Sequence, residues 1–249
     1  MKENTGFEKS FQKTLAKDKT QKEKEGAISL NKLEEFWNKN RKTLIPSLVA
    51  AAVVIVASIL IFNSISSHKK EKSEEADLSI AKILPYYKNQ LYDIALYGDS
   101  TTFNTEREVI GLIKVVEEYE GTDQGKLAAL YAGKSLYILN KPDEAKKYFK
   151  IALKSPSKTV QIGANAGLGV CAEFKGEYKD AIDFYTEAAK LAIDPATKNR
   201  YQYYSALCYE KLGDKEKVAN ICNEIIAEGK SEFVGWSKVL LTRLGIKID

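Results

Sequence analysis

Histidine and cysteine, the residue types that build most metal and nucleophilic centres, are scarce in this chain. Its 249 residues contain one histidine, His68, and three cysteines. A protein zinc site usually takes several ligands from His, Cys and carboxylates, so a lone histidine without a cysteine cluster provides no common zinc site. His68 also lies beside Lys69 in a charged stretch, where we expect it to be solvated and remote from any cysteine that it could activate. The sequence therefore predicts neither an enzyme nor a bound cofactor.

Signals for phosphate and nucleic-acid binding are also missing. The glycine-rich stretch 163–169 is not followed by Gly-Lys-Ser or Gly-Lys-Thr and falls within a predicted helix, so it is not a phosphate-binding loop. The net charge of +4 comes from residues 1–43, which have 11 basic and 7 acidic residues. Residues 66–249 have 27 of each, and this balance argues against an array that binds nucleic acid through one basic face.

The three cysteines show no paired metal-ligand spacing. Cys171, Cys208 and Cys222 all fall inside predicted helices, where an odd number of cysteines without a framework is typical of small buried apolar residues. A disulfide between Cys208 and Cys222 remains an alternative if the chain lies in an oxidising compartment. It requires their α-carbons to lie within about 7 Å of each other.

No charged residue occurs from Leu44 to Ile65, and Ser58 is the only polar residue from Leu48 to Phe62. About 20 helical residues cross a hydrocarbon core of roughly 30 Å, and Pro46 falls in the first turn of the helix, where proline is tolerated. A cleaved signal peptide would not carry 43 residues before its apolar core, and a buried core helix would not have strongly polar flanks on both sides. We expect a single-pass transmembrane helix over 44–65.

The segments around this helix are polar. Residues 1–43 form a charged tail whose first 26 residues we expect to be disordered, and residues 66–77 form a charged tether. Within the tail, Leu30, Leu33, Phe36 and Trp37 recur at helical spacing. This short amphipathic segment could lie on the membrane surface, dock a partner or extend the spanning helix. Five basic residues before the anchor against four after it leave its orientation undecided.

From residue 78 to the end the apolar residues follow a helical period, and no alternating strand pattern occurs. Thr105-x-x-Glu108 predicts a capping box at the start of the second helix, and the turns at Asn140-Lys141-Pro142, Gly176 and Gly213 separate later helices. The last helix is expected to cap the array with a polar outer face that contains Lys238 and Arg243. The predicted helices are 78–97, 105–120, 123–139, 142–154, 159–175, 178–192, 196–212, 215–228 and 231–244.

Small and aromatic residues recur in this region at a spacing of 36 to 37. Gly133, Ala145, Phe149 and Ala152 return 36 residues later as Gly169, Ala181, Tyr185 and Ala188, and a weaker third copy reads Ala206, Val218, Cys222 and Ile225. A fixed period in this range indicates stacked helical hairpins, because one short helix pair cannot bury its apolar face alone. We expect the small residues where two helices cross closely, with Phe149 or Tyr185 in the gap beside them.

These repeats resemble tetratricopeptide repeats, which have Gly or Ala at the eighth position, Ala at the twentieth, an aromatic residue at the twenty-fourth and Ala at the twenty-seventh. The second copy, followed by Pro195, matches best, and the first carries Pro156 at a comparable place. The fourth-position tryptophan is replaced by Ala129 and Asn165, and the third copy lacks most of the small residues. The resemblance implies an all-α solenoid over 78–249 with a C-terminal capping helix.

In the tetratricopeptide family the first helix of each hairpin lines a concave face that binds partner segments. The resemblance therefore implies a partner-binding face on this chain, of aromatic and apolar character, which suits an apolar helix or an extended segment. Any one of these residues could instead belong to the core. The best candidates are Leu127, Leu130, Tyr131, Lys134, Tyr137, Val170, Phe174, Arg200, Tyr203 and Tyr204, with Ile138, Gly163, Ala166, Gly167, Glu173, Leu207 and Glu210 beside them. The carboxylate clamp of some family members is not expected, because Leu130 and Lys134 hold its positions.

The order of parts is itself distinctive: a charged tail, one anchor, a tether, a helix pair containing residues 89–99, and then the repeats. With the segment Tyr119-Glu-Gly-Thr…Gly125-Lys-Leu-Ala-Ala-Leu-Tyr131-Ala-Gly133, it resembles the YfgM-type membrane-anchored tetratricopeptide proteins of bacteria, in a Bacteroidetes-like form. The similarity covers residues 28–245. It implies a cytoplasmic N-terminus, a periplasmic repeat domain at the inner membrane, and association with the Sec translocon, periplasmic chaperones or exported polypeptides.

Two functions follow from these expectations. The first is a non-catalytic scaffold, because a tether raises the effective concentration of a weak groove near its partners. The second is an assembly or self-association module of another envelope complex, for division, gliding or secretion. A cytoplasmic adaptor is a third and weaker alternative.

Overall fold

The computed structural model describes residues 5–99 and 109–247, and it gives no side-chain placement for most of residues 5–35 or for a few positions between 43 and 69. The chain forms two compact units, Met1–Ile65 and Ser66–Asp249. The described residues are mostly helical, which agrees with the predicted all-α class.

Helix α1, Thr5–Lys88, supplies all of the described first unit and continues into the second. Within it, Ile45–Ser64 is the one stretch of the described residues that is long and apolar enough to cross a membrane, and none of it is buried. The expected disorder of residues 1–26 is not what the structure gives from Thr5 onward, because Lys, Glu, Gln and Ala in this stretch all favour helix. The helix also passes through Phe36 and Trp37, in agreement with the amphipathic segment being an extension of the apolar stretch.

Residues 66–77, the expected charged tether, are helical as well, and the side chain of His68 lies outside the described ones. Ala76, Ile80 and Ile83 are buried on one face of α1, at spacings of four and three residues. Gln124 fixes this end of α1 by accepting a hydrogen bond from Ser73 and donating one to Asp77, at 3.1 Å. The second unit therefore begins with packed structure.

The predicted helices 78–97 and 105–120 are wrong in part. The first is interrupted after Lys88 by Gln90, whose φ of 63° lies in the left-handed region, and α2 covers only Tyr92–Tyr97. Two short antiparallel strands follow, β1 at Gly98–Asp99 and β2 at Val109–Ile110, before α3 at Leu112–Glu118. The expected capping box at residues 105–108 lies outside the described residues.

Two glycines permit this strand pair. A β-carbon on Gly98 would lie 2.5 Å from the Val109 carbonyl oxygen, and one on Gly111 would lie 2.1 Å from the Leu96 carbonyl oxygen. Only residues without a side chain fit such close passages of the backbone. Strands of two residues are too short to show an alternating pattern, so they cannot be recognised in the sequence.

The remaining predicted helices are confirmed to within about two residues at each end. They are α4 Asp123–Ile138, α5 Pro142–Ala152, α6 Lys158–Phe174, α7 Tyr178–Leu191, α8 Pro195–Lys211, α9 Lys215–Glu228 and α10 Phe233–Arg243. Three turns between them hold a left-handed residue at the same repeat position: Asn140, Gly176 and Gly213. In each turn the next amide bonds back five residues, as from Lys141 to the Leu136 oxygen at 2.8 Å, which is a common way to end a helix.

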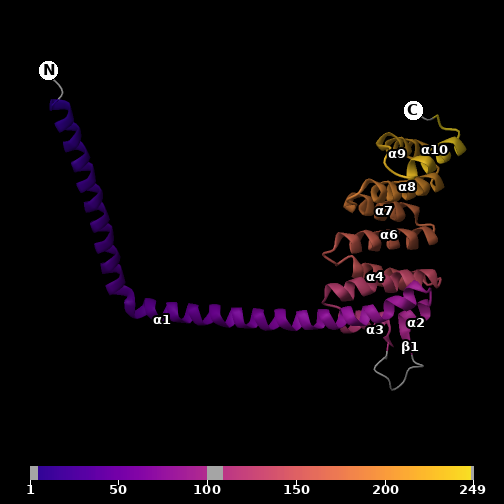
Figure 1. The fold of residues 1–249 in the computed structure, drawn as a ribbon, viewed down its shortest axis with the longest axis horizontal. Helices are drawn as coiled ribbons and strands as arrows, with labels where there is room; N and C mark the ends of the chain where they lie inside the picture. Colours follow the sequence, from indigo (N-terminus) through magenta and orange to yellow (C-terminus); the bar gives the residue numbers. More distant parts are fainter. Residues whose placement is uncertain (1–4, 100–108, 248–249) are drawn as a thin grey trace. The chain divides into compact units, whose positions relative to one another are not determined.

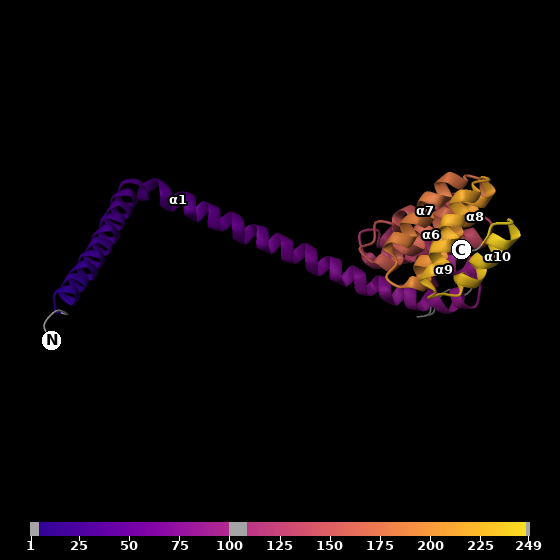
Figure 2. The same ribbon diagram turned by 90° about the horizontal axis from the view of Figure 1, so that it is seen from above.

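Each helix from α4 to α10 packs against the next one in the chain, and α4 also contacts α6 as α8 contacts α10. Within the second unit the helices lie in successive layers from α4 to α10 (Figure 1), and they overlie one another when the unit is turned by 90° (Figure 2). Neighbours along the chain are therefore neighbours in space throughout this unit.

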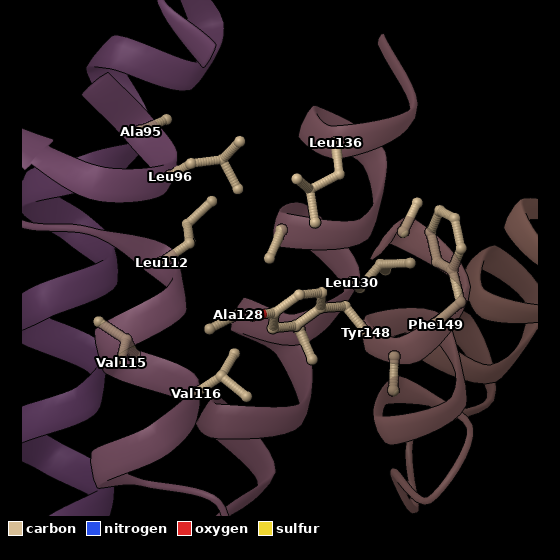
Figure 3. Close-up of a cluster of buried hydrophobic side chains, with 14 of the residues drawn as sticks. Ala95, Leu96, Leu112, Val115, Val116, Ala128, Leu130, Leu136, Tyr148 and Phe149 are labelled. Carbon is tan, nitrogen blue, oxygen red and sulfur yellow. The ribbon is translucent and has the colours of Figure 1, made fainter. Parts of the chain in front are cut away.

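The core of the second unit begins where α2, α3, α4 and α5 meet. Leu96, Leu112, Val116 and Leu136 extend into one shared interior beside Tyr148 (Figure 3). Their shared burial removes apolar surface from water, which is the main stabilising contribution to a unit of short helices.

The expected contacts between small and aromatic residues are confirmed in the first two copies. A β-carbon on Gly133 would lie 2.8 Å from the Phe149 ring, and one on Gly169 would lie 2.6 Å from the Tyr185 ring. Both rings are 1% exposed. Glycine thus lets each ring lie directly against the backbone of the facing helix.

Helix α10 differs from the expected cap. Phe233, Leu240 and Leu241 are buried as a cap requires, but Trp236 and Val239 are 57% and 64% exposed. The outer face is therefore partly apolar and not polar throughout. Lys238 and Arg243 do lie on the exposed side, as predicted.

Candidate protein-interaction face

The predicted interaction residues come from the first helix of each hairpin, α4, α6 and α8, and the structure divides them into three groups. Leu130 is buried, and Phe174 and Arg200 are exposed. The half-buried group consists of Leu127, Tyr131, Lys134, Tyr137, Val170, Tyr203 and Tyr204. Half-buried side chains present one edge for contact while the packed part holds them in place.

Some positions of the predicted face are occupied by the core. Leu130 is 6% exposed and packs on Gly163, whose β-carbon position lies 3.1 Å from the Leu130 methyl carbons. A β-carbon on Gly167 would lie 2.3 Å from the tip of the Phe149 ring, so this glycine also serves core packing. Leu130 and Gly167 thus leave the interaction face, since their space is taken by neighbouring helices.

The centre of the face is a polar cluster around Glu173 of α6. The hydroxyl of Tyr185, from α7, donates a hydrogen bond to the Glu173 carboxylate. Cys208, from α8, donates a hydrogen bond to the same carboxylate. Burial raises the pKa of the Tyr137 phenol, from α4, and the Cys171 and Glu173 charges raise it further. The Glu173 carboxylate therefore links α6 with α7 and α8 through hydrogen bonds.

Burial controls the ionisation of this cluster. Loss of solvent raises the pKa of the Tyr185 hydroxyl far above its ordinary value, and its hydrogen bond to Glu173 raises it further. The same two causes, burial first, raise the pKa of Cys208 to about 12. Both groups stay protonated at neutral pH and act as donors to Glu173.

All three cysteines are free and buried, so the disulfide between Cys208 and Cys222 does not form in this structure. Burial raises the pKa of Cys171 to about 11 and raises that of Cys222 as well. Their expected role as small buried residues is confirmed by exposed fractions of 1% or less.

An aromatic cluster closes the C-terminal end of the face. Tyr204 meets Tyr185 edge to face at a centroid distance of 5.6 Å, and Tyr203 lies 5.6 Å from the Phe233 ring of α10. The Arg200 guanidinium lies 6.0 Å from the same Phe233 ring, a cation–π distance. Helix α10 therefore covers part of the predicted face and shares its aromatic residues.

Lys134 stands at the other end of the face. Its ammonium lies 6.0 Å from the centre of the Tyr131 ring, and burial lowers its pKa. Tyr131 in turn meets Tyr87 of α1 edge to face at 4.9 Å. The N-terminal end of the face thus includes a residue from outside the repeats.

Tyr87, Tyr185 and Phe233 were not among the predicted face residues. Tyr185 was read as a core residue, and the structure adds a polar role through its hydroxyl. Tyr87 and Phe233 come from helices outside the repeat pattern, so period alone could not bring them to the face. The three tyrosines within residues 201–204 were the sequence signal that further aromatic rings could gather at this end of the face, because aromatic rings tend to cluster.

Among residues whose side chains the structure describes, no group of three or more His, Cys, Asp or Glu side chains is arranged to hold a metal ion. The arrangement provides contact surfaces and hydrogen-bonding groups for another molecule. Comparison with known proteins adds no identity: no family model matches the chain, and no curated protein is detectably similar to it.

Proposed function

We propose that this chain is a membrane-anchored, non-catalytic scaffold that binds other proteins through a tetratricopeptide-type solenoid. The observation that carries the proposal is the repeated contact of glycine with an aromatic ring, Gly133 with Phe149 and Gly169 with Tyr185, at a spacing of 36 residues. Contacts between successive helices from α4 to α10 support a solenoid, since each hairpin buries its apolar face on its neighbours.

The apolar stretch Ile45–Ser64 supports the membrane anchor. In the proposal it spans the bacterial inner membrane once, with the N-terminal tail in the cytoplasm and the solenoid in the periplasm. This topology, and the Sec translocon, periplasmic chaperones or exported polypeptides as partners, come from the resemblance to YfgM-type proteins. Anchoring compensates for weak binding because it raises the local concentration of the face near exported chains.

Site-specific photo-crosslinking of the full-length chain in bacterial cells tests the scaffold. A benzophenone amino acid replaces Phe174, which is 57% exposed on the predicted face, and a matched control places it at Ile193, which is 82% exposed between α7 and α8. We expect crosslinks to secretion or folding factors from position 174 and few from position 193. Equal patterns from both positions, or none from 174, would remove the support for this face.

Self-association within another envelope complex is the second candidate. The exposed Trp236 and Val239 of α10 favour it, because large apolar side chains three residues apart on one helix face form a ready contact for a second surface. Sedimentation of the full-length chain in detergent distinguishes the two functions. A stable oligomer that Trp236→Lys converts to a monomer supports self-association, and a monomer at all concentrations supports the scaffold alone.

A further inference from the structure

A hollow lies on another side of the solenoid, between α7, α8 and α9. It has a volume of about 250 Å³ and an almost entirely apolar surface. We call it the α8 hollow. It is lined by Thr186, Ala189, Lys190, Lys198, Gln202, Ser205 and Ile221.

The α8 hollow occupies a place that is filled one repeat earlier. There, Leu168 of α6 is 1% exposed, and Leu153 and Phe184 pack against the same core cluster. At the corresponding positions, 36 or 37 residues on, the chain has Ser205, Ala189 and Ile221. All three replacements have smaller side chains, so the volume they vacate stays open.

The polar side chains of the α8 hollow also differ in hydrogen bonding from the polar side chains one repeat earlier. In the preceding interval Gln161 donates to the Ser155 carbonyl at 2.7 Å, and Asn165 donates to the Gln161 carbonyl at 3.1 Å. Around the hollow the side chains of Thr186, Gln202 and Ser205 have no hydrogen-bond partner among the described residues. Thr186 and Gln202 are half-buried and therefore available to peptide N–H and C=O groups of another molecule, whereas Ser205 is only 3% exposed and lies at the floor of the hollow.

The charges at the rim are balanced. Lys190 pairs with Glu187 at 2.6 Å, and Lys198 pairs with Glu228 at 3.7 Å. Two cations beside two carboxylates give the rim no preference for a charged group. An uncharged occupant is therefore favoured.

Resting on the proposed scaffold function, we propose that the α8 hollow binds one leucine-sized or phenylalanine-sized side chain of a partner polypeptide. The side chain fills the space that the smaller Ala189, Ser205 and Ile221 leave open, and its flanking peptide groups bond to Thr186 and Gln202. The volume supports this occupant. Small-molecule pockets are usually about 300 Å³ or larger, whereas an apolar cavity of about 150 Å³ already holds benzene.

The test uses N-acetylphenylalaninamide, which carries one aromatic side chain between two uncharged amides. Saturation-transfer NMR on the full-length chain in lipid nanodiscs measures its binding, with N-acetylalaninamide as the control ligand and empty nanodiscs as the blank. We expect transfer to the phenyl ring and little to the alanine control. Ser205→Leu refills the hollow, so it weakens binding more than about tenfold, whereas Ser205→Ala keeps the space and stays within about threefold of the unmodified chain.

Absence of specific transfer to the unmodified chain, or binding that Ser205→Leu leaves intact, would overturn the proposal. Ile221→Phe restores the counterpart of Phe184 and gives an independent way to fill the hollow if Ser205→Leu does not fold. The result is separable from the scaffold test. Loss of crosslinks from position 174 with intact probe binding would reject the scaffold face and leave the α8 hollow standing.

Discussion

The ring of Tyr185 lies directly against the backbone of Gly169, and the hydroxyl of the same ring donates to Glu173, one turn further along the same helix. The ring is thus held on its face by α6 and at its tip by a carboxylate of α6. The repeat pattern predicts Tyr185 as the residue that fills the gap between two helices, and its hydroxyl also bonds to the Glu173 carboxylate that accepts from Cys208 of α8. Packing and the polar centre of the proposed face depend on the same side chain.

Gly169→Ala places a methyl group 2.6 Å from the fixed Tyr185 ring. Alanine is better than glycine in a helix by about 1 kcal/mol, but overpacking a core costs about 1–3 kcal/mol. We expect a net loss of up to about 2 kcal/mol in the free energy of unfolding, measured by urea denaturation. Gly235→Ala in α10 is the matched control, because nothing lies within 4 Å of its β-carbon position, and it should stabilise the chain. Stabilisation by both substitutions would contradict the packing argument.

Gly167→Ala and Phe149→Leu should couple. Each alone is destabilising, the first because its β-carbon would lie 2.3 Å from the Phe149 ring and the second because it removes buried ring carbons. In the double variant the shorter leucine makes room for the methyl group. We expect a coupling energy of about 1 kcal/mol or more from a double-mutant cycle of unfolding free energies. Additive effects would mean that the two residues do not compete for one space.

The left-handed turn residues predict that two substitutions differ in their effect on stability. Asn140 has a φ of 60°, and its counterpart Gly213 has a φ of 77°. Glycine adopts this region without a side-chain penalty, so Asn140→Gly should be neutral or slightly stabilising, whereas Gly213→Ala should cost about 1 kcal/mol. Thermal unfolding followed by circular dichroism measures both. A rise in melting temperature for Gly213→Ala would argue against the observed turn.

The raised pKa of Cys208 predicts a loss of stability in alkali. Its folded-state pKa of about 12 exceeds the ordinary value of 9.0, so the unfolded chain releases the thiol proton first as the pH rises. This contribution is complete below pH 9 and decreases between pH 9 and 12, by up to about 1.4 kcal/mol for each pH unit. Cys208→Ala should make the unfolding free energy less dependent on pH in this window. An unchanged slope would show that Cys208 does not contribute to it.

The apolar stretch of α1, as the proposed anchor, predicts that a charged residue within it releases the protein from the membrane. Val54 lies near the middle of Ile45–Ser64, and an arginine at the centre of a spanning helix costs about 2.5–3.5 kcal/mol. Val54→Arg should move the protein from the membrane pellet into the carbonate-soluble fraction, and Val54→Leu should not. Equal retention of both variants in the membrane would count against this stretch as the anchor.

Helix positions from 123 onward could be predicted because period, turn residues and proline agree there. The region 89–111 could not, since its course depends on tertiary contacts: Gly98 and Gly111 look like ordinary glycines until the passing backbones are seen. The helical course of the charged stretch 66–77 could not be predicted for a related reason. Its composition is polar, and only the spacing of Ala76, Ile80 and Ile83 marks the buried face.

For the proposed interaction face, the sequence could predict helix positions but not which side chains are available. Leu130 and Gly167 satisfy the repeat position, yet a neighbouring helix fills the space beside each. Sequence period assigns a residue to a side of its helix, whereas its availability depends on how large the opposing residue is. The α8 hollow also depends on the size of opposing residues, since it lies where Ala189, Ser205 and Ile221 are smaller than their counterparts one repeat earlier.

The third copy lacks the pairing of glycine with a ring, because Ala206 and Cys222 stand where Gly169 and Tyr185 stand one repeat earlier. In the first two hairpins any change of angle between helices must drive a large ring into a main chain, and this makes them stiff. At α8 and α9 the two small residues Ala206 and Cys222 belong to one buried cluster, so the same rotation drives no large ring into a main chain. Under mechanical load the stack of helices from α4 to α10 should bend first between α8 and α9, beside the α8 hollow.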